Sequence, residues 1–257
     1  MVTEADAVMA ADRPVWAPSD VALDQPSVAR IWDWFLGGSH NFAVDREVAR
    51  KTLELMPEGP AMARLSRAFL RRAVTYCAHA GITQFIDLGS GIPTVGNVHE
   101  VARHVTPDAR VVYVDVDPVA VAHTRQMMAS DERTAAVQAD LRDPARVLAA
   151  PELRDLLDLD QPVALLMVMV LHFVSDADDP RGTLAQYRDA LAPGSALVIA
   201  HGSRDTEGMP ADHLHAARQM YERQVSSVTL RTRSEVQALF AGFDLVDPGV
   251  VWVPEWR

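Results

Sequence analysis

The chain has 257 residues, 49% of them hydrophobic, which suits one large α/β domain or such a domain with a helical extension. Its formal net charge is −11, and Lys51 is its only lysine. Proteins that bind DNA or RNA use clustered Lys and Arg to displace counterions, so we expect no nucleic-acid partner.

The N-terminal part of the chain is predicted to be an arm followed by a helical cap. Residues 1–24 have no clear hydrophobic period and are expected to form a flexible arm. They lack a basic region followed by an apolar core, so we expect no secretory signal and a cytoplasmic location. In residues 25–82, apolar residues at helical spacing predict three helices at about 26–36, 45–55 and 60–80. The chain has a single cysteine, Cys77, on the third predicted helix, and one cysteine cannot form an internal disulfide.

Residues 83–257 alternate between short apolar runs and helical patterns, which predicts a core of alternating strands and helices. We predict strands at 84–88, 110–115, 135–139, 163–170 and 195–201. We predict helices at about 95–104, 118–130, 145–157, 180–192, 211–224 and 232–241. The runs 243–246 and 250–253 flank a Pro-Gly turn and are expected to close the sheet as an antiparallel hairpin. The longest apolar run, 163–171, has only the length of a strand, so no membrane span is expected.

A glycine-rich turn follows the first predicted strand. The strand Phe85–Leu88 leads into Gly89–Gly91, and the next strand, Val111–Asp115, ends in an acid. Together they have the spacing of a right-handed βαβ unit, in which ligands bind at the carboxyl ends of the strands. The glycines allow the backbone to approach a ligand closely, and Asp115 can accept hydrogen bonds from a ribose. The pattern predicts a nucleoside-cofactor site.

The spacing of this turn separates two kinds of cofactor. A dinucleotide fingerprint needs G-x-G-x-x-G, but Gly89 and Gly91 are followed by Thr94 where the third glycine would stand. Asp87 precedes the turn and would repel a diphosphate, whereas it suits a ligand with an ammonium group and no phosphate. S-adenosylmethionine is such a ligand, and its sulfonium adds a second positive charge. A nicotinamide oxidoreductase is the disfavoured alternative.

These motifs resemble those of the class I S-adenosylmethionine-dependent methyltransferases. Phe85–Gly91 is similar to their first motif, Val111–Asp117 to their second, and Leu191–Ile199 to their turn into the fifth strand. More narrowly, Pro26–Asp33 and Leu36–Phe42 resemble one bacterial family of S-adenosyl methyltransferases without an assigned substrate. The resemblance implies an α/β, Rossmann-like, seven-stranded and mostly parallel sheet, with helices on both faces and an N-terminal helical cap.

The resemblance also implies the cofactor contacts. We expect Asp87 to reach the methionine amine, Asp115 the ribose hydroxyls and Asp140 the adenine amine. The loop 37–41 either folds over the cofactor or is no more than a helix stop. The other expected cofactor contacts come from these same segments: Gly38, Asn41, Leu88, Gly89, Ser90, Gly91, Val116, Asp117 and Leu141. Since Asp117 precedes a proline, it can alternatively cap the following helix.

Two histidines are the candidate catalytic bases. His172 follows the fourth predicted strand and His201 closes the fifth, so both are expected at the ligand edge of the sheet. Histidine is the natural general base near neutral pH, although a structural role for each remains the alternative. Near the chain ends, Trp16, Trp252 and Trp256 are typical of edge packing, with an acceptor pocket as the alternative interpretation.

The predicted reaction is transfer of a methyl group to an oxygen or nitrogen of a small molecule. The alternative is a non-catalytic protein that binds S-adenosylmethionine or S-adenosylhomocysteine. His213 and His215, with Asp212, lack a third ligand in register, so no metal site is predicted. The partners expected from sequence are therefore the cofactor and a small methyl acceptor, and the oligomeric state is left open.

Overall fold

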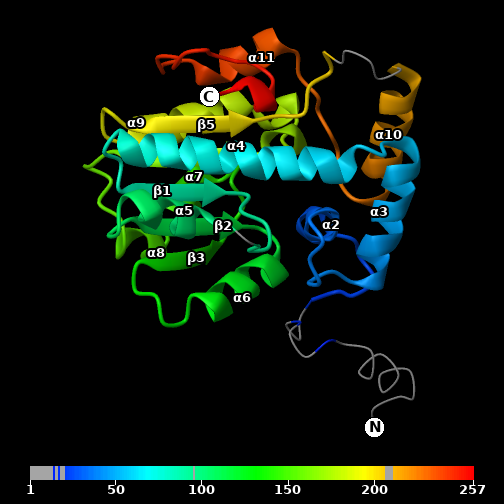
Figure 1. The fold of residues 1–257 in the computed structure, drawn as a ribbon, viewed down its shortest axis with the longest axis horizontal. Helices are drawn as coiled ribbons and strands as arrows, with labels where there is room; N and C mark the ends of the chain where they lie inside the picture. Colours follow the sequence, from blue (N-terminus) through cyan, green and yellow to red (C-terminus); the bar gives the residue numbers. More distant parts are fainter. Residues whose placement is uncertain (1–13, 15–16, 18–20, 95, 206–210) are drawn as a thin grey trace.

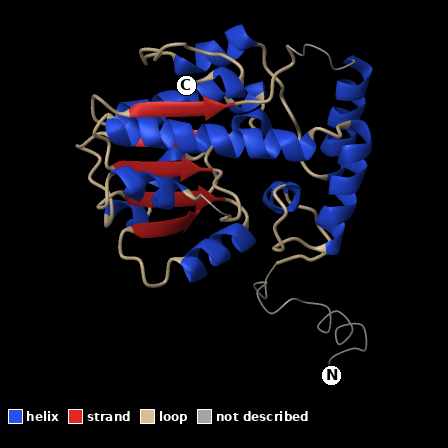
Figure 2. Ribbon diagram, viewed as in Figure 1, coloured by secondary structure: helices blue, strands red, loops and turns tan. Residues whose placement is uncertain are grey.

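A five-stranded parallel sheet forms the centre of the protein (Figures 1 and 2). The computed structural model describes residues 14, 17, 21–94, 96–205 and 211–257. The strand order is β3-β2-β1-β4-β5, with bounds β1 Gln84–Leu88, β2 Arg110–Asp115, β3 Thr134–Gln138, β4 Val163–Val168 and β5 Ala196–Ala200. Most of the predicted flexible arm of residues 1–24, with Trp16, lies outside the described residues, but Val21 at its end is buried in an apolar cluster.

Helices cover both faces of the sheet, which explains why its strands are almost wholly apolar. Neighbouring residues on a strand point to opposite faces, so Phe85 and Ile86 enter different cores. Helices α4 (Gly59–His79) and α5 (Val98–Val105) pack on the face of Phe85. The face of Ile86 is covered by α7 (Pro144–Leu148), α8 (Pro151–Arg154) and α9 (Pro180–Ala190). The helix predicted at 145–157 is thus two short helices, because a proline begins the second.

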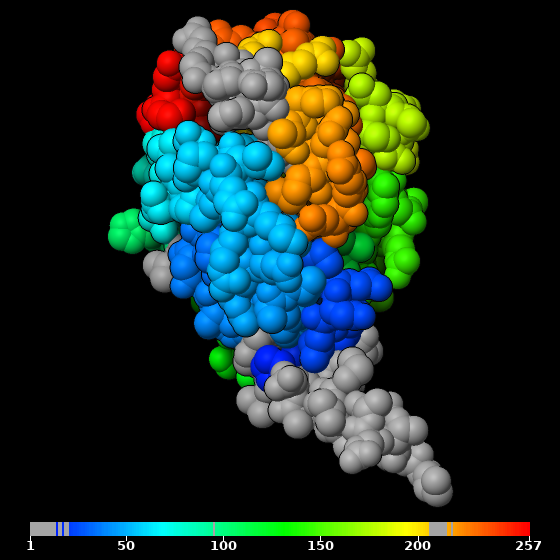
Figure 3. Space-filling view, turned by 90° about the vertical axis from the view of Figure 1, so that its right-hand side faces the viewer, coloured from blue at the N-terminus to red at the C-terminus, as the bar shows by residue number. Residues whose placement is uncertain are grey.

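Three further helices gather beyond the carboxyl ends of the strands: α2 (Val28–Phe35), α3 (Ala43–Leu55) and α10 (Ala211–Gln224) (Figure 1). Helices α3 and α10 lie side by side on the face seen in Figure 3. Their shared apolar cluster includes Ile31, Phe35 and Val48 from the N-terminal helices, with Val225 just after α10. The cap therefore recruits a helix from the second half of the chain, which its N-terminal position in the sequence does not reveal.

The prediction of seven strands is wrong, because the expected closing hairpin does not form. Residues 243–246 and 250–253 contain no strand, and Leu245 and Val246 are 41% and 39% exposed. Instead of a backbone ladder, a side chain holds this segment: Arg72 of α4 donates to the carbonyls of Val253 and Trp256 at 2.7 and 2.8 Å. β5 therefore remains the edge of the sheet. The parallel α/β arrangement itself is confirmed.

The remaining helices complete the alternation. α6 (Pro118–Met127) packs beside β2 and β3. α11 (Arg233–Gln237) precedes two short 3₁₀ turns, Ala238–Phe240 and Val253–Glu255. Other 3₁₀ turns follow β4 at Leu171–Phe173 and Asp176–Asp178. In the described part of the chain, no helix is both long and apolar enough to cross a membrane.

Candidate functional site

A cavity of about 440 Å³ lies at the carboxyl ends of β1, β2 and β4. α4 contributes Ser66, Arg67 and Leu70 to its wall, and the cap contributes Pro26–Ala29 and Trp32. The predicted cofactor contacts that line it are Asp87, Gly89, Ser90, Gly91, Asp115, Val116, Asp117, Asp140 and Leu141. The structure thus brings nine of these side chains and turn residues, predicted from three separate strand ends, to one cavity.

The two glycines of the turn serve different purposes. Both have positive φ angles, +71° at Gly89 and +64° at Gly91, which other residues adopt only with strain. A Cβ on Gly89 would stand 2.3 Å from Cγ2 of Val170, so this glycine allows the turn to pack against the end of β4. A Cβ on Gly91 would meet nothing within 4 Å. Gly91 therefore leaves open space at the cavity, where a ligand can approach the backbone.

Asp115 is held in a fixed orientation by the backbone around it. Its Oδ2 accepts a 2.7 Å hydrogen bond from the Gly91 amide, and its Oδ1 accepts a 2.9 Å bond from the Asp117 amide. Burial raises the pKa of Asp115 to about 6. A carboxylate has about four lone-pair sites, so the group can still accept hydrogen bonds from a ligand in the cavity.

Asp117 caps the helix that follows it. Its Oδ1 accepts a 2.7 Å bond from the Val119 amide at the start of α6. Its Oδ2 accepts from the Ser27 hydroxyl and, at 3.2 Å, from the guanidinium of Arg30. The capping alternative is therefore confirmed, and the same carboxylate ties the cap helix α2 to the sheet.

Arg30 is a residue that the sequence analysis missed. Its side chain is buried and bridges Asp45 at 2.8 Å and Asp117 at 3.2 Å. It lies beside Ile31 on an amphipathic helix. The sequence signal that could have revealed it is an arginine next to a position predicted to be buried. Arg67 was missed as well, because α4 carries several arginines and only the fold shows which of them lines the cavity.

Asp87 and Arg67 bring opposite charges to the same cavity. Burial raises the pKa of Asp87 to about 7, and Arg67 opposes this rise. Burial also lowers the pKa of Arg67, while Asp87 opposes that change. Burial therefore destabilises the charged form of each group, and the opposite charge of the other offsets this only in part, as is common at binding sites.

Asp140 is more exposed than the other acids and already has a partner. Arg142 binds it through Nε and Nη2, at 3.0 and 2.6 Å, and this ion pair lowers the pKa of Asp140. The neighbouring Leu141 accepts a 2.9 Å hydrogen bond on its carbonyl from the hydroxyl of Tyr187. The end of β3 is thus anchored to α9, and Asp140 stays ionised near neutral pH.

Three of the predicted cofactor contacts do not line the cavity. Leu88 is fully buried in the sheet core. Asn41 donates at 2.8 Å to Oδ2 of the buried Asp33, and at 3.0 Å to the carbonyl of Gly38. A Cβ on Gly38 would lie 1.9 Å from Oδ1 of Asp33. The loop 37–41 therefore wraps around the Asp33 carboxylate, which supports its interpretation as a helix stop.

The two predicted bases lie at the carboxyl ends of β4 and β5, but they do not line this cavity. His172 is buried, and desolvation lowers its pKa to about 3. Both ring nitrogens of His201 are engaged, Nδ1 with the Gly202 carbonyl at 2.7 Å and Nε2 with Arg231 at 2.9 Å. Burial lowers the pKa of His201 to about 4. Among the described residues, no histidine lines the 440 Å³ cavity.

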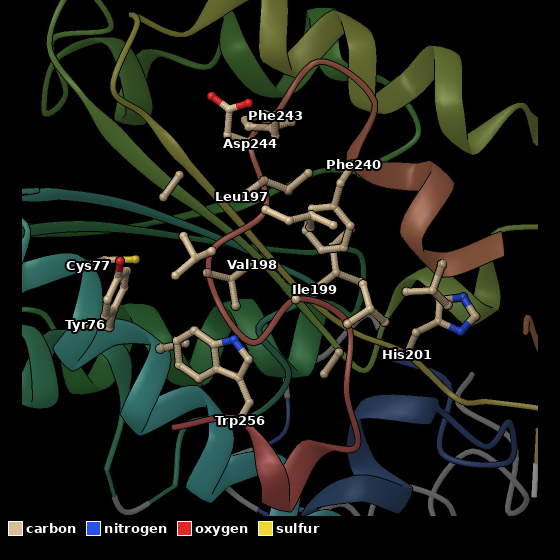
Figure 4. Close-up of a pocket in the computed structure, with 18 of the residues that line it drawn as sticks. Tyr76, Cys77, Leu197, Val198, Ile199, His201, Phe240, Phe243, Asp244 and Trp256 are labelled. Atoms are coloured by element: carbon tan, nitrogen blue, oxygen red, sulfur yellow. The ribbon is translucent and has the colours of Figure 1, made fainter. Parts of the chain in front are cut away.

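A second cavity, of about 1000 Å³, runs along the free edge of β5 (Figure 4). Its wall combines β5 with α4 and the C-terminal segment, and includes Phe240, Phe243, Trp252 and Trp256. Trp256 also packs edge-to-face on Tyr76, with ring centroids 5.7 Å apart. This cavity occupies the side of β5 where the expected hairpin would have paired. The acids of the smaller cavity, Asp87, Asp115, Asp117 and Asp140, do not line it.

Comparison with known proteins agrees with this geometry. The sequence matches the S-adenosyl methyltransferase family over residues 14–257. A proposed methyltransferase from Thermobifida fusca YX is 40% identical, with a TM-score of 0.89 over 95% of this chain and 90% of that chain. A DUF574 family protein from Streptomyces avermitilis MA-4680 is 38% identical, with a TM-score of 0.87 over 92% of this chain and 91% of that chain. No curated protein matches the chain.

The residues of the smaller cavity fit the cofactor of this family. S-adenosylmethionine carries an ammonium, a sulfonium and two ribose hydroxyls, and the cavity offers buried carboxylates together with an open approach at Gly91. The family match covers almost the whole chain. The chain therefore belongs to the S-adenosyl methyltransferase family and is an S-adenosylmethionine-dependent methyltransferase.

Proposed function

We propose that this enzyme methylates an oxygen or nitrogen atom of a small molecule in the 440 Å³ cavity. The observation that carries the proposal is the grouping of Asp87, Asp115 and Gly91 in one cavity, to whose wall the cap also contributes. The rest of the wall includes Trp32, Phe173 and residues 225–227, which are aromatic, aliphatic or small and polar. Such a wall suits a small and largely uncharged acceptor.

The residues of the cavity would hold the cofactor at both ends. Asp115 accepts from the ribose hydroxyls, Asp140 from the adenine amine, and Asp87 from the methionine ammonium. When bound, the cofactor supplies an electrophilic methyl group on its sulfonium. The contribution of the protein is to align the acceptor with that methyl group and to exclude water, which accounts for a large part of the rate of a bimolecular transfer.

The acceptor is expected to react without losing a proton to His172 or His201. His172 lines neither of the two cavities, and His201 uses both ring nitrogens within the protein. We therefore favour acceptors that react without a histidine base, such as amines in the neutral form and acidic phenols. Positioning, rather than proton removal by His172 or His201, is the proposed source of catalysis.

The test is a panel of paired acceptors, each phenol matched with the corresponding aniline, with S-adenosylhomocysteine release as the readout. We expect acceptor-dependent release with at least one class, and at least a tenfold slower reaction for Asp115→Ala at a subsaturating cofactor concentration. Binding of the cofactor without release for any pair would contradict the proposal and favour a binding protein. Release with only thiol or carbon acceptors would retain the enzyme but refute the assigned atom.

A further inference from the structure

The outer edge of β5 carries backbone groups without a partner. The carbonyl of Ala200 accepts a 2.8 Å hydrogen bond from the amide of Met169, so the backbone groups of Ala200 point towards β4. Successive residues of a strand point their N–H and C=O groups to opposite sides, so those of Leu197 and Ile199 point away from β4. Within the described residues, no hydrogen bond reaches the backbone groups of Leu197 or Ile199. Two donors and two acceptors are therefore free on this edge.

This free edge lies in the wall of the 1000 Å³ cavity (Figure 4). Phe240, Phe243 and Trp256 line the same cavity, so the free backbone groups have apolar surroundings. A small apolar molecule would match these surroundings but would leave the backbone groups unpaired, which is unfavourable wherever water is displaced. An extended peptide offers both N–H and C=O groups and apolar side chains, and it matches the whole cavity.

Exposed apolar side chains gather at this cavity. Six large hydrophobic residues are exposed among the described residues, and three of them line it: Leu245, Val246 and Trp252, at 41%, 39% and 37%. Apolar residues that are exposed together mark interaction sites, whereas single ones are ordinary. The cavity therefore has the surface of a binding site as well as the volume of one.

The charges around the cavity cancel, although the chain as a whole carries a net charge of −11. The lining residues with formal charges are two arginines and two aspartates: Arg188, Arg233, Asp205 and Asp244. This balance matches a segment whose side chains are uncharged, and it gives no advantage to an acidic or a basic one.

We propose that β5 accepts an extended, uncharged and apolar peptide segment of another protein as an additional edge strand in this cavity. The residues of such a segment that face β5 recur at every second position, about 6.6 Å apart. Leu197 and Ile199 have the same spacing, so their free groups can pair with the segment in register. The site is separate from the cofactor cavity, and the proposal does not depend on which acceptor is methylated.

Two other occupants fit this edge less well. The C-terminal segment of the same chain is held aside, because Arg72 donates to the carbonyls of Val253 and Trp256, and Trp256 packs on Phe69 with ring centroids 5.5 Å apart. A second copy of the chain would present a β5 edge lined by its own C-terminal segment, so two such edges cannot meet directly.

The first test compares two short capped peptides of alternating valine and threonine, one of them N-methylated at every backbone amide. Both carry the same side chains, but only the unmethylated peptide can donate to the free carbonyls of β5. Calorimetry should show it binding about 5- to 150-fold more tightly, the range for loss of two neutral hydrogen bonds. Equal affinities, or no binding of the unmethylated peptide at millimolar concentration, would overturn the proposal.

Amide hydrogen exchange of the full chain then locates the peptide. Binding should slow exchange at Leu197 and Ile199, whereas Val198, whose amide points towards β4, should change little. Slow exchange at Leu197 and Ile199 without the peptide would show that the chain itself covers the edge. A dimer in sedimentation that the peptide dissociates would assign the edge to a second copy. Either result would overturn the proposal.

Leu245→Ser and Leu65→Ser form a matched pair of variants. The two leucines are 41% and 45% exposed, but only Leu245 lines the cavity. Leu245→Ser should weaken the unmethylated peptide about 3- to 30-fold, whereas Leu65→Ser should leave its affinity unchanged. Both variants should bind S-adenosylhomocysteine as the parent does, which checks that they are folded. Equal losses of peptide affinity in the two variants would place the peptide elsewhere and overturn the proposal.

Discussion

At the scale of single residues, the two buried acids Asp87 and Asp115 of the 440 Å³ cavity lie in surroundings that disfavour their ionised forms. Asp87 and Asp115 are 5% and 8% exposed, and burial raises their pKa values to about 7 and about 6. A buried carboxylate without a full counter-charge favours its neutral form. A cationic ligand reverses this preference because it stabilises the ionised form.

This linkage predicts a pH-dependent affinity. In the proposed arrangement Asp87 accepts from the ammonium of the ligand. Below pH 7 the empty protein holds a proton on Asp87 that this ammonium must displace, so affinity should fall as the pH falls. We expect a plateau above about pH 7.5, a loss of about fivefold from pH 7 to pH 6, and a steeper loss below pH 6 where Asp115 also takes a proton. Calorimetry with S-adenosylhomocysteine from pH 8 to 5.5 checks this. Asp87→Asn should lack the component near pH 7, and a flat profile for the parent protein would refute the linkage.

The neighbouring acids Asp115 and Asp117 should differ in what their loss affects. In the proposed arrangement Asp115 accepts two charge-assisted bonds from the ribose, so Asp115→Ala should weaken cofactor binding about 10- to 1000-fold. Asp117→Ala removes the cap of α6 and a partner of buried Arg30, so it should lower the unfolding free energy by about 1–3 kcal/mol. Its effect on affinity should stay below about tenfold, since Asp117 already uses its oxygens within the protein.

Urea denaturation and ligand titration of both variants, beside the parent, separate the two effects. A greater loss of affinity for Asp117→Ala than for Asp115→Ala would show that the ribose contact has been assigned to the wrong acid.

At the scale of elements, the strands and their terminal acids could be predicted, because a buried parallel strand has a plain sequence pattern. β1 and β2 have the predicted bounds, and their acids reach one cavity because parallel strands end at the same edge. The C-terminal hairpin failed because Arg72 and Trp256 anchor that segment through side chains. Its two apolar runs look like strands locally, and only the tertiary contacts decide otherwise.

The site was harder to predict where its residues come from helices. Arg30 and Arg67 lie far from the strand motifs in the chain, and helical periodicity does not tell which arginine turns inward. His172 and His201 follow the ends of β4 and β5 as expected, but neither lines the 440 Å³ cavity. Their surroundings, such as the bond from Arg231 to His201, involve a residue 30 positions away in the chain. A base and a structural histidine therefore look the same in the sequence.

The ion pair of the cap predicts a stability effect. Arg30 is the buried link between α2, α3 and the end of β2, and Arg30→Met leaves the carboxylates of Asp45 and Asp117 without it. Breaking a buried pair typically costs about 3–5 kcal/mol. The exposed pair of Lys51 and Glu47 is the control, and Lys51→Met should cost less than about 0.5 kcal/mol. Chemical denaturation measures both, and similar losses in the two variants would show that Arg30 does not hold the cap.

At the scale of the whole molecule, the 440 Å³ cavity joins several parts of the chain, and three of them lie far apart in the sequence: the cap, the turn after β1 and the end of β4. A ligand there should restrain all three at once. We expect S-adenosylhomocysteine to slow amide hydrogen exchange in α2, in residues 89–91 and in residues 168–170. α7 and α8, which supply no residue to the cavity wall, should be unchanged and serve as the internal control. Protection confined to one of the three parts would show that the ligand does not join them.

The strand order has a consequence for the synthesis of the protein. β1 lies at the centre of the sheet, where Gln84 pairs with Arg110 on one side and with Val163 on the other. A ribosome delivers β1, β2 and β3 well before β4, so a nascent chain can form the first half of the sheet while one side of β1 is still open. Asp87 and Asp115 are then already made, but the wall at Val168–Val170 is not. The wall of the 440 Å³ cavity is therefore complete only after the second half of the chain has emerged and docked.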